Sequence, residues 1–185
     1  VVNYSNSKQG NSFDLAGAIY SGIAGLTASL YSSVYEDTWR QHYLGASYLK
    51  PLAGNRSLGL DLHLYRTTDT GKALSGRIDN TTWSLTPSYR TGAHTFSLGY
   101  QQVDGDTPFD YVTRGAIFIG NAVQLSDFNA PNERSWQARY DLAMQSFGLP
   151  GLVFSALYVR GSGIDGSHVD PHGGYAWLGY GKGCL

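Results

Sequence analysis

The chain has 185 residues and a formal net charge of −1, so it lacks the excess of basic residues that typifies nucleic-acid-binding domains. Charged residues make up only 15% of it, below the roughly 25% that is usual for soluble domains, whereas glycine (24) and tyrosine (14) are abundant. The single cysteine, Cys184, excludes disulfides and cysteine-based metal sites within the chain.

Alternation of apolar and polar residues predicts β-strands along most of the chain, because successive side chains of a strand point to opposite faces. In the first such segment Phe13, Leu15 and Ile19 share the apolar face. In chain order we predict about ten strands or part-strands, and the clearest segments are 12–20, 26–31, 57–66, 80–90, 94–102 and 134–144. The segments 37–49 and 152–160 are also strand-like but alternate less cleanly.

The segment 57–66, SLGLDLHLYR, shows this alternation most clearly. Positions 58, 60, 62 and 64 are all leucine, and the opposite face carries Asp61, His63 and Tyr65. A soluble sandwich or a lipocalin-like binding barrel would bury the leucines in its core. A transmembrane barrel would instead turn them toward lipid and leave the polar face to line a wet interior.

The connections between the predicted strands favour the transmembrane barrel. Tight turns are predicted at 21–22, 51–55, 91–92 and 148–151, and they alternate with connections at 33–36, 67–78, 103–132 and 161–174, three of which are long. Short turns at one end and long loops at the other are typical of outer-membrane barrels, as are strands of roughly 9–13 residues. Trp83, Tyr89 and Trp136 end apolar faces, as the aromatic girdles of such barrels do.

Several motifs in the same order resemble the OprD family of substrate-specific porins. The clearest are GDTPFDY at 105–111, SDFNAPNERSWQARYDL at 126–142, FGLPGLVF at 147–154 and GSGIDG at 161–166, and the segments 37–48 and 78–89 are also similar. The resemblance implies an all-β, antiparallel transmembrane barrel of roughly 18 strands. It also implies a monomeric channel in the outer membrane of a Gram-negative bacterium, in contact with lipid and lipopolysaccharide.

The resemblance further implies passive, substrate-selective diffusion of small carboxylate-bearing solutes, either aromatic or simple carboxylates. The segment RGA at 114–116 departs from the pattern of family members that take basic amino acids, which makes such solutes a poorer match. The whole chain, 1–185, is expected to belong to one barrel domain and to correspond to the middle of the family's sequence, with further barrel on either side.

A carboxylate channel needs cationic side chains on its polar faces, and arginine suits this role because its planar fork binds a carboxylate with two parallel hydrogen bonds. Arg139 is the strongest candidate. The residues predicted to line the pore are Arg40, His42, Asp61, His63, Tyr65, Gln137, Arg139 and Asp141.

The segment 103–132 is too long for a plain connection and has an apolar middle, IFIGNAV at 117–123. We therefore expect it to fold into the barrel and to form the constriction. Its candidate solute contacts are Tyr111, Arg114, Asn121, Ser126 and Asp127.

Catalysis and cofactor binding have little support in the sequence. The chain has no G-x-S-x-G motif, and its scattered serines and histidines define no triad. The segment GIDGSHVDPHGG at 163–174 contains aspartate and histidine, but its glycine and proline content predicts an exposed loop rather than a metal site. We therefore expect no enzyme activity, no metal and no cofactor.

Overall fold

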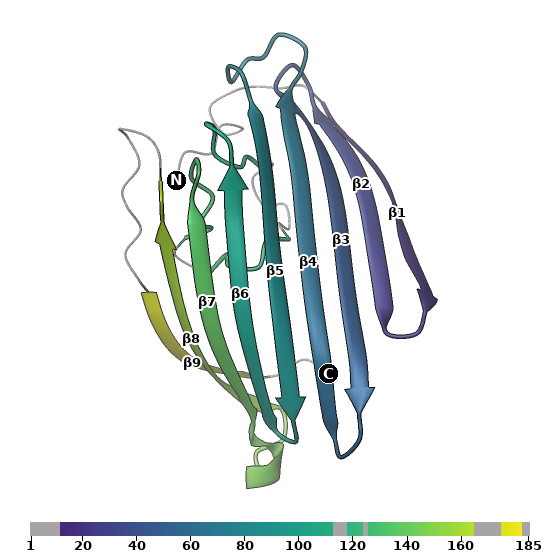
Figure 1. Ribbon diagram of the computed structural model, residues 1–185, viewed down its shortest axis with the longest axis vertical. Helices are drawn as coiled ribbons and strands as arrows, with labels where there is room; N and C mark the ends of the chain where they lie inside the picture. The colour runs from purple at the N-terminus through teal and green to yellow at the C-terminus, as the bar shows by residue number, and fades with distance from the viewer. Residues whose placement is uncertain (1–11, 113–117, 124–125, 165–174, 183–185) are drawn as a thin grey trace.

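Nine antiparallel strands form one sheet in the computed structural model, which describes residues 12–112, 118–123, 126–164 and 175–182 (Figure 1). Each strand pairs with the next along the chain, so the sheet is a simple meander in the order β1 to β9. The elements are β1 (Phe13–Ile23), β2 (Leu26–Tyr35), β3 (Trp39–Leu52), β4 (Arg56–Asp69), β5 (Asp79–Thr91), β6 (His94–Asp104), β7 (Arg134–Ala143), the 3-10 helix η1 (Met144–Phe147), β8 (Leu152–Ser162) and β9 (Tyr175–Lys182).

The predicted asymmetry of the connections is confirmed, but the first tight turn lies at residues 24–25 and not at the predicted 21–22, which belong to β1. At one end, short connections join β1 to β2, β3 to β4 and β5 to β6, and glycines with positive φ allow the chain to reverse there, such as Gly25 (φ 78°) and Gly92 (φ 57°). We call this the turn end and the opposite one the loop end (Figure 1). None of the described helices is long and apolar enough to cross a membrane.

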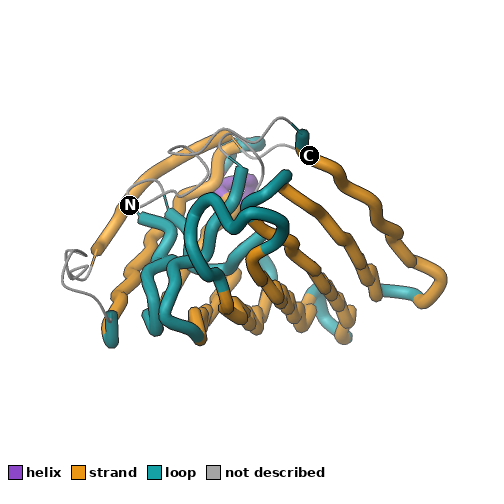
Figure 2. Tube along the Cα trace, turned by 90° about the horizontal axis from the view of Figure 1, so that it is seen from above, coloured by secondary structure: helices purple, strands orange, loops and turns teal. Residues whose placement is uncertain are grey.

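The distribution of apolar and polar residues is inverted relative to a soluble protein. Leu98 is 61% exposed and Trp136 is 62% exposed, whereas Asn80, Gln101 and Ser135 are fully buried. The sheet is curved, and the segments between β6 and β7 lie within its concave side (Figure 2). The exposed leucines of β4 lie on the opposite, convex face, which excludes a soluble barrel with a leucine core.

Two aromatic belts border the apolar part of the convex face. Toward the loop end, the rings of Trp83 and Tyr100 lie 5.1 Å apart, and those of Tyr100 and Trp136 lie 4.4 Å apart. The belt toward the turn end contains Tyr89, Phe96 and Tyr140. Along β5 the two belts are six residues apart, which is about 20 Å of strand.

β1 differs from the expectation that apolar faces turn outward. Its register places Phe13 opposite Tyr35, and the ring of Phe13 meets that of Trp39 edge-on at 6.0 Å. Because Trp39 contacts the segment inside the arch, the apolar face of β1 lies on the concave side. Leu15 and Ile19 share this face, at 59% and 63% exposure. The prediction that these residues share one face of a strand is therefore confirmed, but the prediction that this face turns outward is wrong for β1.

Candidate functional site

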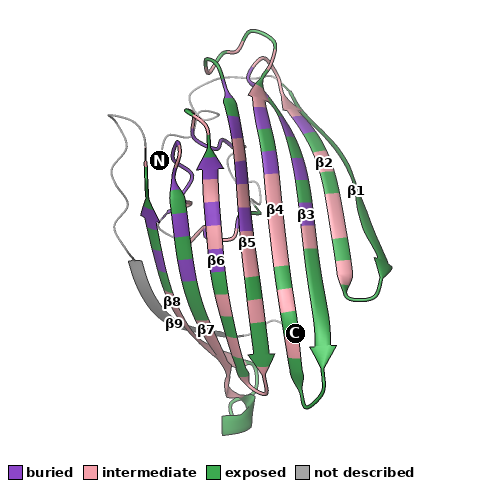
Figure 3. Cartoon of the chain, in the orientation of Figure 1, coloured by how far each residue is buried: buried purple, intermediate pink, exposed green. Residues whose placement is uncertain are grey.

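The connection between β6 and β7 spans residues 105–133, and we call it the inward loop. Its described parts, 105–112, 118–123 and 126–133, fold back across the concave face (Figure 2). Two hydrogen bonds join its first limb, which contains Phe109, to its second limb, which contains Asn129. The backbone N–H of Phe109 donates to the carbonyl of Asn129 (2.9 Å), and the side-chain amide of Asn129 donates back to the carbonyl of Phe109 (2.9 Å). Buried residues therefore concentrate in the halves of β3 to β7 nearest the loop end (Figure 3).

Polar side chains from the strands hold the first limb. The indole N–H of Trp39 donates to a carboxylate oxygen of the buried Asp110 (2.8 Å), and the Gln41 amide donates to the Asp110 carbonyl (3.1 Å). The Asn80 amide donates to the carbonyl of Pro108 (3.0 Å). Because these groups are buried, each hydrogen bond satisfies a donor or acceptor that would otherwise be costly.

Gln101 of β6 holds the second limb with both ends of its side chain. Its amide donates to the carbonyls of Asp127 (2.8 Å) and Phe128 (2.9 Å), and its carbonyl accepts from the N–H of Asn121 (3.0 Å). The Asn121 side chain donates in turn to Ser135 of β7 at 2.9 Å. A side chain on Gly99 would collide with the Asn121 amide, so glycine is required for this approach.

The backbone in the middle of the inward loop donates hydrogen bonds to a tyrosine and a serine hydroxyl of the sheet. The Tyr65 hydroxyl accepts from the N–H of Phe118 (3.1 Å), and the Ser84 hydroxyl accepts from the N–H of Gly120 (2.9 Å). The rings of Tyr65 and Phe109 lie 4.7 Å apart, within a cluster that joins the loop to the sheet. Within the apolar middle of the loop, Ile119 is therefore buried against the concave face, whereas Phe118 remains 49% exposed.

The candidate residues of the inward loop divide into buried and accessible groups. Asn121 and Ser126 are buried and stabilise the loop itself. Tyr111 and Asp127 are partly exposed, and the Tyr111 hydroxyl donates to the Asp127 carboxylate at 2.5 Å. Burial, and then this bond to Asp127, raise the pKa of Tyr111. Arg114 lies outside the described residues, as does most of the 163–174 segment.

Two candidate residues of β4 on the concave face, Asp61 and His63, contact hydroxyl groups of the neighbouring strand β3. The Ser47 hydroxyl donates to Asp61 (2.6 Å), and the Tyr43 hydroxyl lies 2.8 Å from a ring nitrogen of His63. Tyr65 is buried beneath the inward loop, as is Gln137, whose amide reaches the carbonyl of Gly120 at 3.5 Å.

Arg139 and Asp141 form an ion pair within β7. The Arg139 Nε and one of its terminal nitrogens donate to the Asp141 carboxylate at 2.8 and 2.9 Å, and the Ser155 hydroxyl donates to the same carboxylate at 2.5 Å. The two bonds to Asp141 fix the orientation of the Arg139 guanidinium. Because the Arg139 side chain is 48% exposed, it is accessible from the concave side.

Arg40 and His42 are not on the concave face, contrary to the prediction that they line the pore. In β3 the residues Trp39, Gln41 and Tyr43 are buried beneath the inward loop, whereas Arg40 and His42 alternate with them and are exposed. Since neighbouring residues of a strand face opposite sides, both side chains lie on the convex face.

Glu133 is a buried acid that the sequence did not single out. It lies at the base of the inward loop, and one of its carboxylate oxygens accepts from the N–H of Ala130 (3.0 Å), while the other has no partner. Burial raises the pKa of Glu133 to about 7, and the bond from Ala130 offsets only part of this effect. A side chain at Gly161 would collide with this carboxylate, so the pocket around it is tight.

We expect the base of the inward loop to be held more firmly in acid than in base. The folded-state pKa of Glu133 is above its ordinary value of 4.5, so its stabilising contribution is complete below about pH 4.5 and is lost as the pH rises through about 7. The measurement is hydrogen exchange of the Val103 and Ala130 amides between pH 5 and pH 8, corrected for intrinsic exchange. Glu133→Gln should abolish the dependence.

Asp104→Asn is the control for this prediction, because it removes an exposed acid at the same end of the sheet. If Asp104→Asn abolishes the pH dependence as well as Glu133→Gln does, the effect is one of general charge and the assignment to Glu133 is wrong.

A sheet with an apolar convex face between two aromatic belts, and a polar concave face crossed by a folded loop, defines the wall of a transmembrane β-barrel channel. The family model described as "outer membrane porin, OprD family" matches residues 1–179. The chain therefore belongs to the OprD family of outer-membrane porins, which confirms the predicted all-β barrel fold and outer-membrane location.

Individual relatives agree with this assignment. Porin D of Pseudomonas aeruginosa is 50% identical over 181 residues, which are 92% of this chain and 41% of that protein. The porin-like protein GalP of Pseudomonas putida is 34% identical over 131 residues, 70% of this chain and 32% of its own length. The chain spans less than half the length of these relatives.

Solved structures give the same result. The crystal structure of the outer membrane protein OprD from Pseudomonas aeruginosa superposes with a TM-score of 0.85 at 50% identity and covers 91% of this chain and 44% of that one. OpdL of the same species superposes with a TM-score of 0.82 at 34% identity, covering 92% and 47%. Among the described residues, no cluster of histidine, cysteine and acidic side chains could hold a metal ion.

Proposed function

We propose that this chain supplies part of the wall and the constriction of a monomeric, passive channel for small carboxylate-bearing solutes. The observation that carries the proposal is the Arg139–Asp141 pair on the concave face of β7. Asp141 engages one edge of the guanidinium and leaves the remaining terminal N–H groups for a carboxylate from solution.

A channel must bind its solute weakly enough to release it. A lone arginine in a narrow pore would hold an anion strongly, but Asp141 neutralises part of the charge of Arg139 before the solute arrives. The arrangement therefore suits transient contact rather than tight binding. The inward loop, anchored on five strands, would narrow the passage through which the solute reaches this pair.

A second candidate solute is an amino acid with a cationic side chain. Its carboxylate would meet Arg139, and its cationic group would meet Asp127, whose carboxylate is held by Tyr111 on the partly exposed surface of the inward loop. The departure at 114–116 argues against this candidate, and a direct comparison of benzoate with arginine as permeant distinguishes the two.

We expect Arg139→Gln to lower benzoate permeation through the reconstituted channel by up to about fivefold. The estimate follows because a half-exposed ion pair contributes about 1 kcal/mol at most. The measurement is solute influx into liposomes, with benzamide as the uncharged reference. The matched control is Arg160→Gln, which removes an exposed arginine from β8 that lies opposite Trp136 on the convex face.

Equal losses for benzoate and benzamide would show that Arg139→Gln changes the pore width rather than a carboxylate contact, and the assignment of Arg139 would then be wrong. Unchanged benzoate influx would overturn it as well. Arginine influx that exceeds benzoate influx in the unmodified channel would instead select the second candidate.

A further inference from the structure

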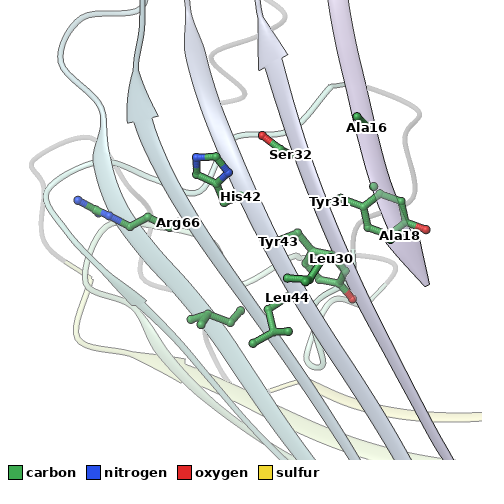
Figure 4. Close-up of a pocket in the computed structure, with 11 residues that line it drawn as sticks. Ala16, Ala18, Leu30, Tyr31, Ser32, His42, Tyr43, Leu44 and Arg66 are labelled. Atoms are coloured by element: carbon green, nitrogen blue, oxygen red, sulfur yellow. The ribbon is translucent and has the colours of Figure 1, made fainter. Parts of the chain in front are cut away.

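The convex face carries a hollow of about 530 Å³ across β1 to β4, close to the loop end (Figure 4). The small side chains of Ala16 and Ala18 on β1 form its shallow side, and larger side chains on the next strands rise beside them. Its opposite wall consists of Leu30, Leu44 and Leu64, which form one row across β2, β3 and β4. Because its lining is mostly apolar and it lies on a lipid-facing surface, the hollow can accept an acyl chain.

Cationic side chains stand on the rim of this hollow. In the next row toward the loop end, the register aligns Ser32, His42 and Arg66, and all three border the hollow (Figure 4). Arg40 follows two residues along β3 on the same face. Neither the Arg40 nor the His42 side chain forms a hydrogen bond or ion pair with any of the described residues.

The charge of this rim is positive after nearby acids are counted. Arg66 pairs with Asp79 at 2.5 Å, and Arg77 lies 3.8 Å from the same carboxylate. Asp14 is also on the convex face, two strands away from Arg40. Asp79 orients the Arg66 guanidinium and leaves its other N–H groups free, so Arg40 and Arg66 can both donate to an anion. Arginine pairs with phosphate through two parallel hydrogen bonds.

The depth of the rim matches the head-group region of the outer leaflet. Long loops of outer-membrane barrels are extracellular, so the loop end of the sheet faces the lipopolysaccharide leaflet. The change from leucines to polar side chains within one row, from Leu44 to His42 and from Leu64 to Arg66, marks the boundary between hydrocarbon and head groups. A phosphate at this boundary would sit directly above acyl chains.

We propose that this surface binds one lipopolysaccharide molecule, with a lipid A phosphate between Arg40, His42 and Arg66 and an acyl chain in the hollow beside Ala16 and Ala18. The inference rests on the outer-membrane placement of the barrel and not on the transported solute. The ligand needs both the phosphate and the acyl chain, because the phosphate suits the cationic rim and the acyl chain suits the apolar hollow. A lipid with an anionic head group has both features, whereas a free phosphate has only one.

The test is native mass spectrometry of the detergent-purified channel titrated with bis-phosphorylated lipid A. We expect Arg40→Gln combined with Arg66→Gln to weaken binding about tenfold, because two charge-assisted contacts are lost. Ala16→Leu fills the hollow and keeps the charges, and it should weaken binding by a similar factor. Dephosphorylated lipid A should bind the unmodified channel as weakly as bis-phosphorylated lipid A binds the double variant.

Matched controls lie on the same convex face of other strands. Arg134→Gln combined with Arg160→Gln removes two exposed arginines from β7 and β8, and Ala138→Leu enlarges an exposed alanine of β7. Both controls should leave lipid A binding unchanged, and channel conductance verifies the folding of every variant. If the controls weaken lipid A binding as much as the site variants do, the effect is a general property of the convex surface, and the proposed site is wrong. Displacement of lipid A by millimolar inorganic phosphate would overturn a lipid-specific site in favour of a free-anion site.

Discussion

Leu62→Arg should destabilise the folded barrel by about 2–4 kcal/mol, which is the range for an arginine on the lipid face near the bilayer midplane. Leu62 lies at the centre of β4, and its register neighbours Ala46 and Leu85 are apolar residues of the same convex face. A guanidinium at this position would have neither water nor a counterion within hydrocarbon. The measurement is urea-dependent folding of the channel into lipid vesicles.

Ser88→Arg is the matched control, because Ser88 pairs with Gly59 on the concave face of the adjacent strand β5. Its side chain can extend into the aqueous interior, so we expect a change of less than about 1 kcal/mol. If Ser88→Arg destabilises the barrel more than Leu62→Arg does, the concave face contacts lipid and the assignment of the two faces is reversed.

This contrast rests on a feature that the sequence predicted well. In β4 leucine occupies every second position over four repeats, so all the leucines lie on one face of the strand. Only one orientation of the strand therefore places all of them in lipid. The same reasoning fails in β3, because Arg40 and His42, on the convex face, are more polar than Trp39 on the concave face. The phase of β3 is decided by contacts with the inward loop, about 70 residues later, which no local pattern contains.

The sequence predicted the inward fold of the long loop and several pore-lining residues, but not the side chains that hold the loop in place. The apolar middle of the segment 103–132 indicated an inward fold, and the polar faces of β4 and β7 indicated Asp61, His63 and Arg139. The buried amides of Asn80 and Gln101 were missed, because asparagine and glutamine on the wet face of a strand look the same whether water or a loop satisfies them. Their only sequence signal is position, near the strand ends next to the long loop.

Gln101→Leu should release the second limb of the inward loop and raise the single-channel conductance. The substitution nearly preserves volume but leaves the carbonyls of Asp127 and Phe128 and the N–H of Asn121 without their partner in a buried environment. Each unsatisfied buried group costs about 1–3 kcal/mol, so the anchored state should lose roughly 3 kcal/mol or more. If the loop narrows the pore as proposed, its release gives larger and noisier currents.

Gln102→Leu provides the control within the same strand. Gln102 is the next residue of β6 and lies on the other face, where it bonds to Tyr100 and Asp104 and not to the loop. Hydrogen exchange of the Asn121 amide should accelerate in Gln101→Leu and remain slow in Gln102→Leu. Fast exchange with unchanged conductance would show that the inward loop can detach without widening the channel, and the constriction would have to lie elsewhere on the concave face. Slow exchange in both variants would mean that the Ser135 and Ser84 contacts suffice to hold the loop, and that Gln101 is not its main anchor.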